Sequence, residues 1–230
     1  MDDFSGFPKE LFTFLDQLAA NNNREWFKDN KERYYDVVVD PVCDFIEAME
    51  PRLHVISRHF VADSRPHGGS MFRIYRDTRF SKDKRPYKEN VGCQFRHEAG
   101  KDAHAPGFYV HLGRDEIFYG GGLWLPSNPV LSLVRDAIVE HPKEWFTITN
   151  SLTFINHFGG IDGDSLKRAP RGYDPEHPLI EDLKRKSLFA MRTASKEQAM
   201  SPRFVDDIEG TFFALSPLME FLTRAVKLPY

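Results

Sequence analysis

Positive charge gathers in one short segment of the chain, between Arg73 and Lys88. Seven of its sixteen residues are lysine or arginine and two are aspartate, so the segment carries a formal charge of +5. The whole chain carries −3, and everything outside the segment therefore sums to −8. Arginine presents a forked set of donors that suits phosphate and carboxylate groups, and lysine adds a compact positive charge. We interpret the segment as an anion-binding loop, with Arg73 at its floor and the surrounding cations Arg76, Arg79, Lys82, Lys84 and Lys88.

The alternative is that this segment is only a structural loop. Asp77 and Asp83 lie within it and can pair with neighbouring arginines. Two carboxylates cannot neutralise seven cations, but acidic side chains from elsewhere in the chain can contribute. In that case each arginine should have a carboxylate partner in the fold, whereas a binding loop leaves cations for an anion to pair with.

A second group of polar side chains falls on one face of a predicted sheet. Residues 107–112 alternate, so Tyr109 and His111 point away from the face that packs into the core. In the preceding strand Gln94 falls on the same polar side. If the two strands form a hairpin, the register that keeps apolar residues together places Gln94 across from Tyr109 or His111.

The beginning of the charged segment follows the same alternation. It predicts a strand in which Phe72 and Ile74 face the core, while Arg73 and Tyr75 face the polar side. The polar face then combines an arginine, a glutamine, two tyrosines and a histidine, which suits a ligand that is partly anionic and partly aromatic or sugar-like. A solvent-exposed face with helices on the other side only is the alternative.

Two further stretches could contribute to a site. Residues 120–122 are three glycines in a row before Trp124, which allows a ligand to approach the backbone closely or else forms a bend. Further along, Lys167 and Arg168 begin a second basic stretch that could complete an anion pocket or cover a helix end.

Several familiar kinds of site have no match in the chain. The histidines His97, His104 and His111 do not recur at metal-ligand spacing, and we predict no metal site. The glycine run fits neither of the common nucleotide-binding glycine motifs. We therefore assign no catalytic residue and no cofactor, and whether the protein is an enzyme stays open.

The periodicity of apolar residues predicts the elements that carry these side chains. Helical spacing dominates residues 8–53 and 127–228, with Pro41 expected to kink one helix and Pro217 to break another. Period-two patterns predict strands near 55–62, 70–76, 89–97, 107–113 and 116–124, and a short strand near 188–192. The connections are too short for crossover helices, so we expect an α+β fold: a mainly antiparallel sheet of about five strands with N- and C-terminal helices packed on it. We expect residues 1–230 to form one domain.

Composition indicates what kind of core the protein has and in which cellular compartment to expect it. Hydrophobic residues make up 41% of the chain and include 20 phenylalanines, which indicates a firm aromatic core. Two cysteines cannot form a disulfide framework, and the first residues lack the apolar run of a signal peptide. With no apolar stretch long enough to span a membrane, we expect a cytoplasmic protein without a membrane partner.

Four stretches resemble the family called domain of unknown function 2461. The resemblance implies one domain, and it brings no established activity, substrate or catalytic residue. The stretches are NNNREWF (21–27), RIYRDTRFSKDK with PYK (73–84 and 86–88), GGGLW (120–124) and KRAPRGY (167–173).

Two classes of function follow from these observations. The first is a small-molecule site for a phosphorylated or carboxylated ligand, which predicts that the charged segment, Tyr109, His111 and the glycine run converge on one concavity. The second is a nucleic-acid or protein interaction surface, which predicts a flat basic patch with exposed aromatic residues. The acidic remainder of the chain favours the first class over nucleic acid, and the oligomeric state is left open.

Overall fold

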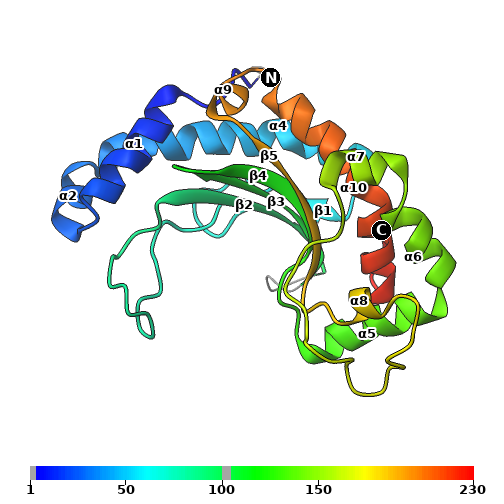
Figure 1. Ribbon diagram of the computed structural model, residues 1–230. Coiled ribbons are helices and arrows are strands. Elements are labelled where there is room, and N and C mark those ends of the chain that lie inside the picture. Colours follow the sequence, from blue (N-terminus) through cyan, green and yellow to red (C-terminus); the bar gives the residue numbers. More distant parts are fainter. Residues whose placement is uncertain (1–3, 100–104) are drawn as a thin grey trace.

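Alternating apolar residues build an antiparallel sheet at the centre of the protein. The computed structural model describes residues 4–99 and 105–230, and the sheet has the strand order β1-β2-β3-β4-β5 (Figure 1). This confirms the α+β class expected from the sequence. The strands are β1 (Phe60–Val61), β2 (Asn90–His97), β3 (Gly107–Gly113), β4 (Ile117–Leu123) and β5 (Leu188–Ala194).

Helices from both ends of the chain cover one face of the sheet. The N-terminal helices are α1 (Lys9–Ala20), α2 (Arg24–Asp29), α3 (Lys31–Tyr34), the π-helical turn η1 (Tyr35–Val39) and α4 (Asp40–Ile56). In Figure 1, α1 and α4 arch over the sheet. The C-terminal helices are α5 (Asn128–Glu140), α6 (Pro142–Thr149), α7 (Leu152–Phe158), α8 (Ile180–Leu183), α9 (Lys196–Ala199) and α10 (Phe204–Ala225).

The core lies between the sheet and these helices, and aromatic rings fill much of it. Phe108 of β3 stacks on Phe212 of α10 with ring centroids 4.4 Å apart, and Phe60 meets Phe108 edge-on at 5.0 Å. Phe45 of α4 lies 6.3 Å from Phe95 of β2. All five side chains are buried, so the phenylalanine-rich composition is explained by a sheet that must bury one whole face.

Proline shapes two of the helices without ending them. Just before Pro41, the Asp40 N–H bonds to the Tyr35 carbonyl five residues earlier, which is the π-helical pattern, and the chain continues directly into α4. Pro217 lies inside α10, so the predicted break there is wrong. Pro217 has no N–H, so the Phe213 carbonyl lacks its usual helical donor. Both residues are on the exposed side of the helix, where water can donate to that carbonyl.

The predicted strand at 70–76 is wrong. Met71 forms only an isolated bridge with Cys93, and the chain then leaves the sheet. The predicted strand at 55–62 is reduced to β1, because α4 continues to Ile56. The fifth strand is instead β5, which corresponds to the short strand expected near 188–192. It pairs with β4 over its whole length.

The described ranges, 4–99 and 105–230, contain no helix that is both long and apolar enough to cross a membrane.

Candidate ligand-binding groove

The sheet face opposite the core, here called the open face, has a floor of glycines between polar and aromatic side chains. The register places Gly107 of β3 beside Gly122 of β4, and Tyr109 beside Gly120. Gln94 lies beside Tyr109 on the other side, as the alternation predicts. Side chains are thus removed from the middle of the face, and a ligand can lie flat against the backbone there. Other side chains of the open face are Val61, Arg96, His111, Phe118, Phe189, Met191 and Thr193.

A groove of about 680 Å³ runs over this floor. That volume falls within the range typical of small-molecule sites. Seen in Figure 1, the open face looks onto the space between the loop that follows residue 72 and the chain around α5 and α8. The groove is lined by Phe72, Gln94, Gly107, Tyr109, Glu116, Phe118, Gly121, Gly122, Trp124, Asp162, Phe189, Met191 and Thr193.

One wall of the groove is made by Phe72 and Tyr109, whose ring centroids are 6.2 Å apart. Gly92 makes room for both rings, because a Cβ there would lie 2.7 Å from the Tyr109 hydroxyl and 3.0 Å from Phe72. The prediction that Phe72 faces the core is therefore wrong. The bridge between Met71 and Cys93 turns Met71 inward and Phe72 outward, and the buried Ile74 lies beyond the point where the chain leaves the sheet.

Three cations lie near this wall, although they are not among the residues that line the groove. The Lys88 Nζ lies 5.3 Å from the centre of the Phe72 ring. Burial and the neighbouring Arg73 lower the pKa of Lys88. Arg96 belongs to the open face beside Gly107. In the part of the chain that the structure describes, no ion pair joins these three cations to a carboxylate, so an anion has unpaired charge to meet there.

The opposite end of the groove combines aromatic surface with a carboxylate. The rings of Trp124 and Phe189 are 5.1 Å apart. Asp162 is held next to Phe189 by a backbone bridge, and its Oδ1 accepts the Gly163 N–H at 2.6 Å. Glu116 is the second carboxylate in the lining. Asp162 therefore places one carboxylate at the β5 edge of the groove, whereas the charge of Glu116 acts on Tyr109 and His111.

The Gln94 side chain lines the groove with one hydrogen-bonding atom unused. Its Oε1 is buried and accepts no hydrogen bond from any residue that the structure describes. A buried acceptor left without a donor costs about 1–3 kcal/mol. The end of a glutamine side chain turns easily about its last torsion, so either its oxygen or its nitrogen can face a ligand.

Tyr109 and His111 form a half-buried polar pair at the side of the groove. The Tyr109 hydroxyl and the Asn90 Nδ2 lie 3.2 and 3.3 Å from the His111 Nδ1, and the imidazole stacks on Phe118 at 4.4 Å. The Asn90 Nδ2 can only donate, so the His111 Nδ1 accepts and the neutral ring carries its proton on Nε2. Burial raises the pKa of Tyr109 to about 12. Burial also lowers the pKa of His111, and Glu116 opposes this shift in part.

We expect His111 to titrate below pH 6.5, the usual value for histidine. The unfolded chain then binds the proton at a higher pH than the folded one, so stability falls as pH drops below about 6.5 and rises as pH increases through that window. The measurement is an NMR titration of the imidazole protons, with a His111→Gln variant to assign the signal. A midpoint at or above 6.5 would contradict the buried, neutral ring.

The arginines beyond Arg73 in the charged segment are mostly paired within it. Arg76 and Arg85 both meet Asp83 at 2.7 Å, and Arg79 meets Asp77 at 2.7 Å. The paired Arg79 lowers the pKa of Asp77 to about 2, and the pKa of Asp83 is lowered further by its two arginines. For these three arginines, the structural-loop alternative raised by the sequence describes the contacts.

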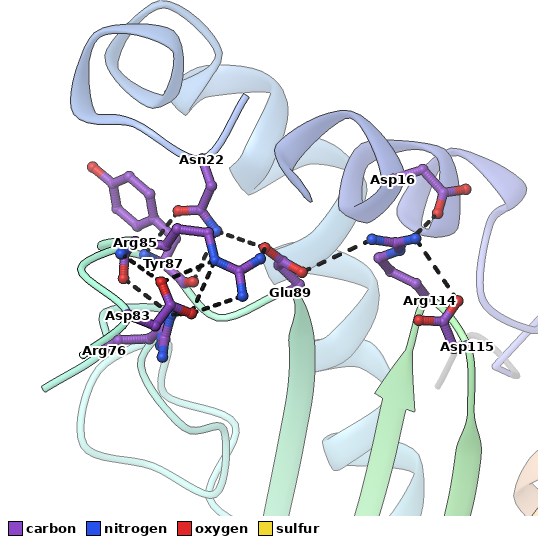
Figure 2. Close-up of polar contacts among 9 residues, drawn as sticks. All are labelled: Asp16, Asn22, Arg76, Asp83, Arg85, Tyr87, Glu89, Arg114 and Asp115. Carbon is purple, nitrogen blue, oxygen red and sulfur yellow. Dashed lines mark hydrogen bonds and ion pairs between the residues drawn. The ribbon is translucent and has the colours of Figure 1, made fainter. Parts of the chain in front are cut away.

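Asn22 fastens the base of this loop to the N-terminal helices (Figure 2). Its Nδ2 donates to the Tyr87 carbonyl at 3.1 Å and its Oδ1 accepts the Tyr87 N–H at 3.1 Å. The same Nδ2 donates to Glu89 at 2.9 Å, and Glu89 also meets Arg85 at 2.5 Å. On its other side Glu89 lies 3.9 Å from Arg114, which extends the network toward Asp16 and Asp115. The loop is thus anchored to the chain that joins α1 and α2.

The rest of the predicted site residues lie away from the groove. Lys84 donates to the Thr78 carbonyl at 2.9 Å, within the loop itself. Tyr75 packs against Tyr87 rather than on the open face of the sheet, contrary to prediction. Lys82, Lys167 and Arg168 are exposed and do not line the groove.

Several groove residues escaped the sequence analysis. Phe118 has the alternation of its strand as a signal, yet the abundance of phenylalanine indicates an aromatic core and does not single out one ring on the other face. Phe189 and Met191 lie on β5, whose partner in the sheet is set by a contact distant in sequence. Asp162 gave no signal, because an isolated bridge to Phe189 is what brings it to the groove.

Within the described residues, no three histidine, cysteine, aspartate or glutamate side chains gather in a way that could hold a metal ion. His104, weighed above as one of three regularly spaced histidines, lies outside those residues.

A family model described as "Conserved hypothetical protein (DUF2461)" matches residues 10–221, which is most of the chain. This confirms the resemblance found from the four sequence stretches. No curated protein and no solved structure matches the chain.

Proposed function

The chain belongs to the DUF2461 family of conserved hypothetical proteins, and from that premise we propose that it binds a small molecule in the open-face groove. The ligand is anionic at one end and carries a planar, largely apolar body. Its body lies on the glycine floor between the aromatic walls, and its anionic group meets Lys88 and Arg73.

The observation that carries this proposal is the cation pair beside the apolar wall. Lys88 is partly buried against Phe72, close to a second cation, and neither has a carboxylate partner among the described residues. Like charges in a partly desolvated place repel each other more strongly than in water. An anion bound between them removes this repulsion, while the groove supplies apolar area for the rest of the ligand.

A nucleic-acid surface on the charged segment is the weaker candidate. Arg76, Arg79 and Arg85 already have carboxylate partners, so fewer charges are left to release counterions from a phosphate backbone. The groove is also recessed, whereas a surface for a polymer would be flat and open.

The test is thermal unfolding with and without 1-naphthyl phosphate, a compact aromatic anion, at constant ionic strength. A ligand present at 100 times its Kd stabilises the folded state by about 2.7 kcal/mol. For a chain of this size that raises the Tm by roughly 5–11 °C. Lys88→Met, which keeps the apolar stem and removes the charge, should abolish most of the shift.

Arg79→Met is the matched control, because Arg79 is exposed and paired with Asp77. It should leave the ligand-dependent shift unchanged. Equal shifts in the wild type and in Lys88→Met would indicate general salt effects, and the proposal would then be wrong.

A further inference from the structure

We infer that the planar body of the groove's ligand carries an amide-like edge, an N–H donor beside a carbonyl acceptor, and that Gln94 recognises this edge. The inference rests on the proposed function and deepens it, because it names the polar group that the body must offer. The observation behind it is the side-chain amide of Gln94, which makes no hydrogen bond to any residue that the structure describes.

The backbone of Gln94 is fixed on both sides. Its N–H donates to the Ser70 carbonyl at 2.8 Å, and on the other side it pairs with Tyr109 of β3. The alternation of the strand directs the side chain to the open face, where it lines the groove. Only the side-chain torsions are left free, so the amide stays within reach of this part of the groove.

Gly107 leaves room for the amide. The Gln94 Nε2 lies 3.5 Å from the position that a Cβ on Gly107 would take. The end of the side chain therefore lies beside bare backbone of β3, and no side chain at Gly107 is present to bond with it. The Oε1 atom is buried and has no donor among the described residues. A hydrogen-bonding group is thus held at the groove floor with its capacity unused.

The hydroxyl and carboxylate groups of the lining are in a different situation. The Tyr109 hydroxyl belongs to the polar pair described above, and Glu116, Asp162 and Thr193 are exposed. An exposed group only exchanges water for a ligand, with little net gain, whereas a buried group without a partner gains a bond that it lacks. The Gln94 amide is therefore the group in the lining that selects most strongly for a ligand's hydrogen bonds.

A side-chain amide is satisfied by an edge that donates and accepts side by side. Its oxygen accepts and its NH₂ group donates, and glutamine makes two bonds at once to an edge with the complementary pattern. A lactam or another amide, with its N–H next to its carbonyl, has this pattern. Rotation about the last side-chain torsion turns the Gln94 amide toward it. A ring without the N–H leaves the Gln94 oxygen unpaired, and a site of this kind rejects such an analogue.

The experiment is an NMR titration of the nitrogen-15-labelled full chain with two neutral compounds of the same shape. Isoquinolin-1-one has a ring N–H beside its carbonyl, and isocoumarin has an oxygen in place of that N–H. We expect isoquinolin-1-one to bind about tenfold or more tightly than isocoumarin, and the side-chain amide signals of Gln94 to shift as it binds. In Gln94→Leu, which keeps a side chain of similar size, the two compounds should bind within twofold of each other.

Asn156→Leu is the control, because it removes an amide from an exposed position of α7 outside the groove lining. It should keep the tenfold preference. Equal binding of the two compounds to the wild type, or a preference that survives Gln94→Leu, would overturn the inference. Should Gln94→Leu fail to fold, the wild-type amide signals of Gln94 decide, since signals that stay in place while isoquinolin-1-one binds contradict it.

The stabilisation by 1-naphthyl phosphate, measured in parallel, separates this inference from the proposed function. If 1-naphthyl phosphate raises the Tm while isoquinolin-1-one has no advantage over isocoumarin, the amide edge is wrong and the proposed function stands. If none of the three compounds binds, both are wrong.

Discussion

Gly122→Ala should be among the most destabilising single substitutions in the protein, at about 2–6 kcal/mol. Two independent penalties add at this position. The φ angle of Gly122 is +142°, a conformation that side chains rarely adopt and that costs about 1–3 kcal/mol. A Cβ would also lie 2.3 Å from the Leu188 carbonyl oxygen and 2.5 Å from the Phe189 Cα, so β4 and β5 would have to separate, at a further cost of about 1–3 kcal/mol.

Alanine substitutions at two other glycines distinguish the cost of the backbone conformation from the cost of the steric clash. Gly159 has a φ of +73° at the end of α7 but nothing within 4 Å of its Cβ position, so Gly159→Ala should cost only about 1–2 kcal/mol. Gly210 lies inside α10 with open space around it, and Gly210→Ala should stabilise by about 0.5–1 kcal/mol. The measurement is chemical denaturation of all three variants. A Gly122→Ala protein as stable as Gly159→Ala would mean that β5 does not pair with β4 at this point.

The Gly122 case also shows which parts of the fold were predictable. Alternation within residues 89–97, 107–113 and 116–124 predicted three neighbouring strands to within a residue or two, because one face of each is buried and the period of two is strict. The same rule limits the partner of Gln94 to Tyr109 or His111, and in the structure the partner is Tyr109. The glycine run predicts either close approach of a ligand to the backbone or a bend, and in the structure it is the backbone of β5 that comes close to Gly120 and Gly122.

The sequence could not predict which segments that are far apart in the chain pair with each other in the sheet. The stretch at 70–76 alternates like a strand, yet it pairs with β2 only at Met71, because residues 74–76 instead bond to residues 86–88. The fifth strand of the sheet is instead β5, which pairs with β4 although more than sixty residues separate the two strands in the sequence. Local periodicity contains no information about such a pairing.

The same limit applies to the groove. Tyr109 and His111 follow from the alternation of their strand and Trp124 from the glycine run before it, and the structure places all three on or beside the open face. The charged segment was found from composition alone, which cannot separate Arg79, bound to Asp77, from Lys88, which stands over Phe72. Only the path of the loop, fixed by Asn22, decides which cations reach the groove.

Phe108→Ala and Phe118→Ala should differ in their effects on stability and on ligand binding, because the two residues lie on opposite faces of the sheet. Phe108 is fully buried between Phe60 and Phe212, and removing its ring leaves a cavity that the neighbouring helix cannot fill. Truncation of a buried phenylalanine costs about 3–5 kcal/mol. For a chain of this length the Tm should fall by roughly 6–20 °C.

Phe118 is the matched position on the open face, three residues along β4 from Gly121, the cross-strand partner of Phe108. It stacks on His111 and lies 6.0 Å from Tyr109, but its remaining surface faces the groove. Because less area is buried, Phe118→Ala should cost under about 2 kcal/mol, while the ligand-dependent rise in Tm should disappear with the wall of the groove. Phe108→Ala should keep that rise at temperatures where it is folded. An equal loss of stability in both variants would mean that the open face is packed against another part of the protein, which would leave no groove for a ligand to enter.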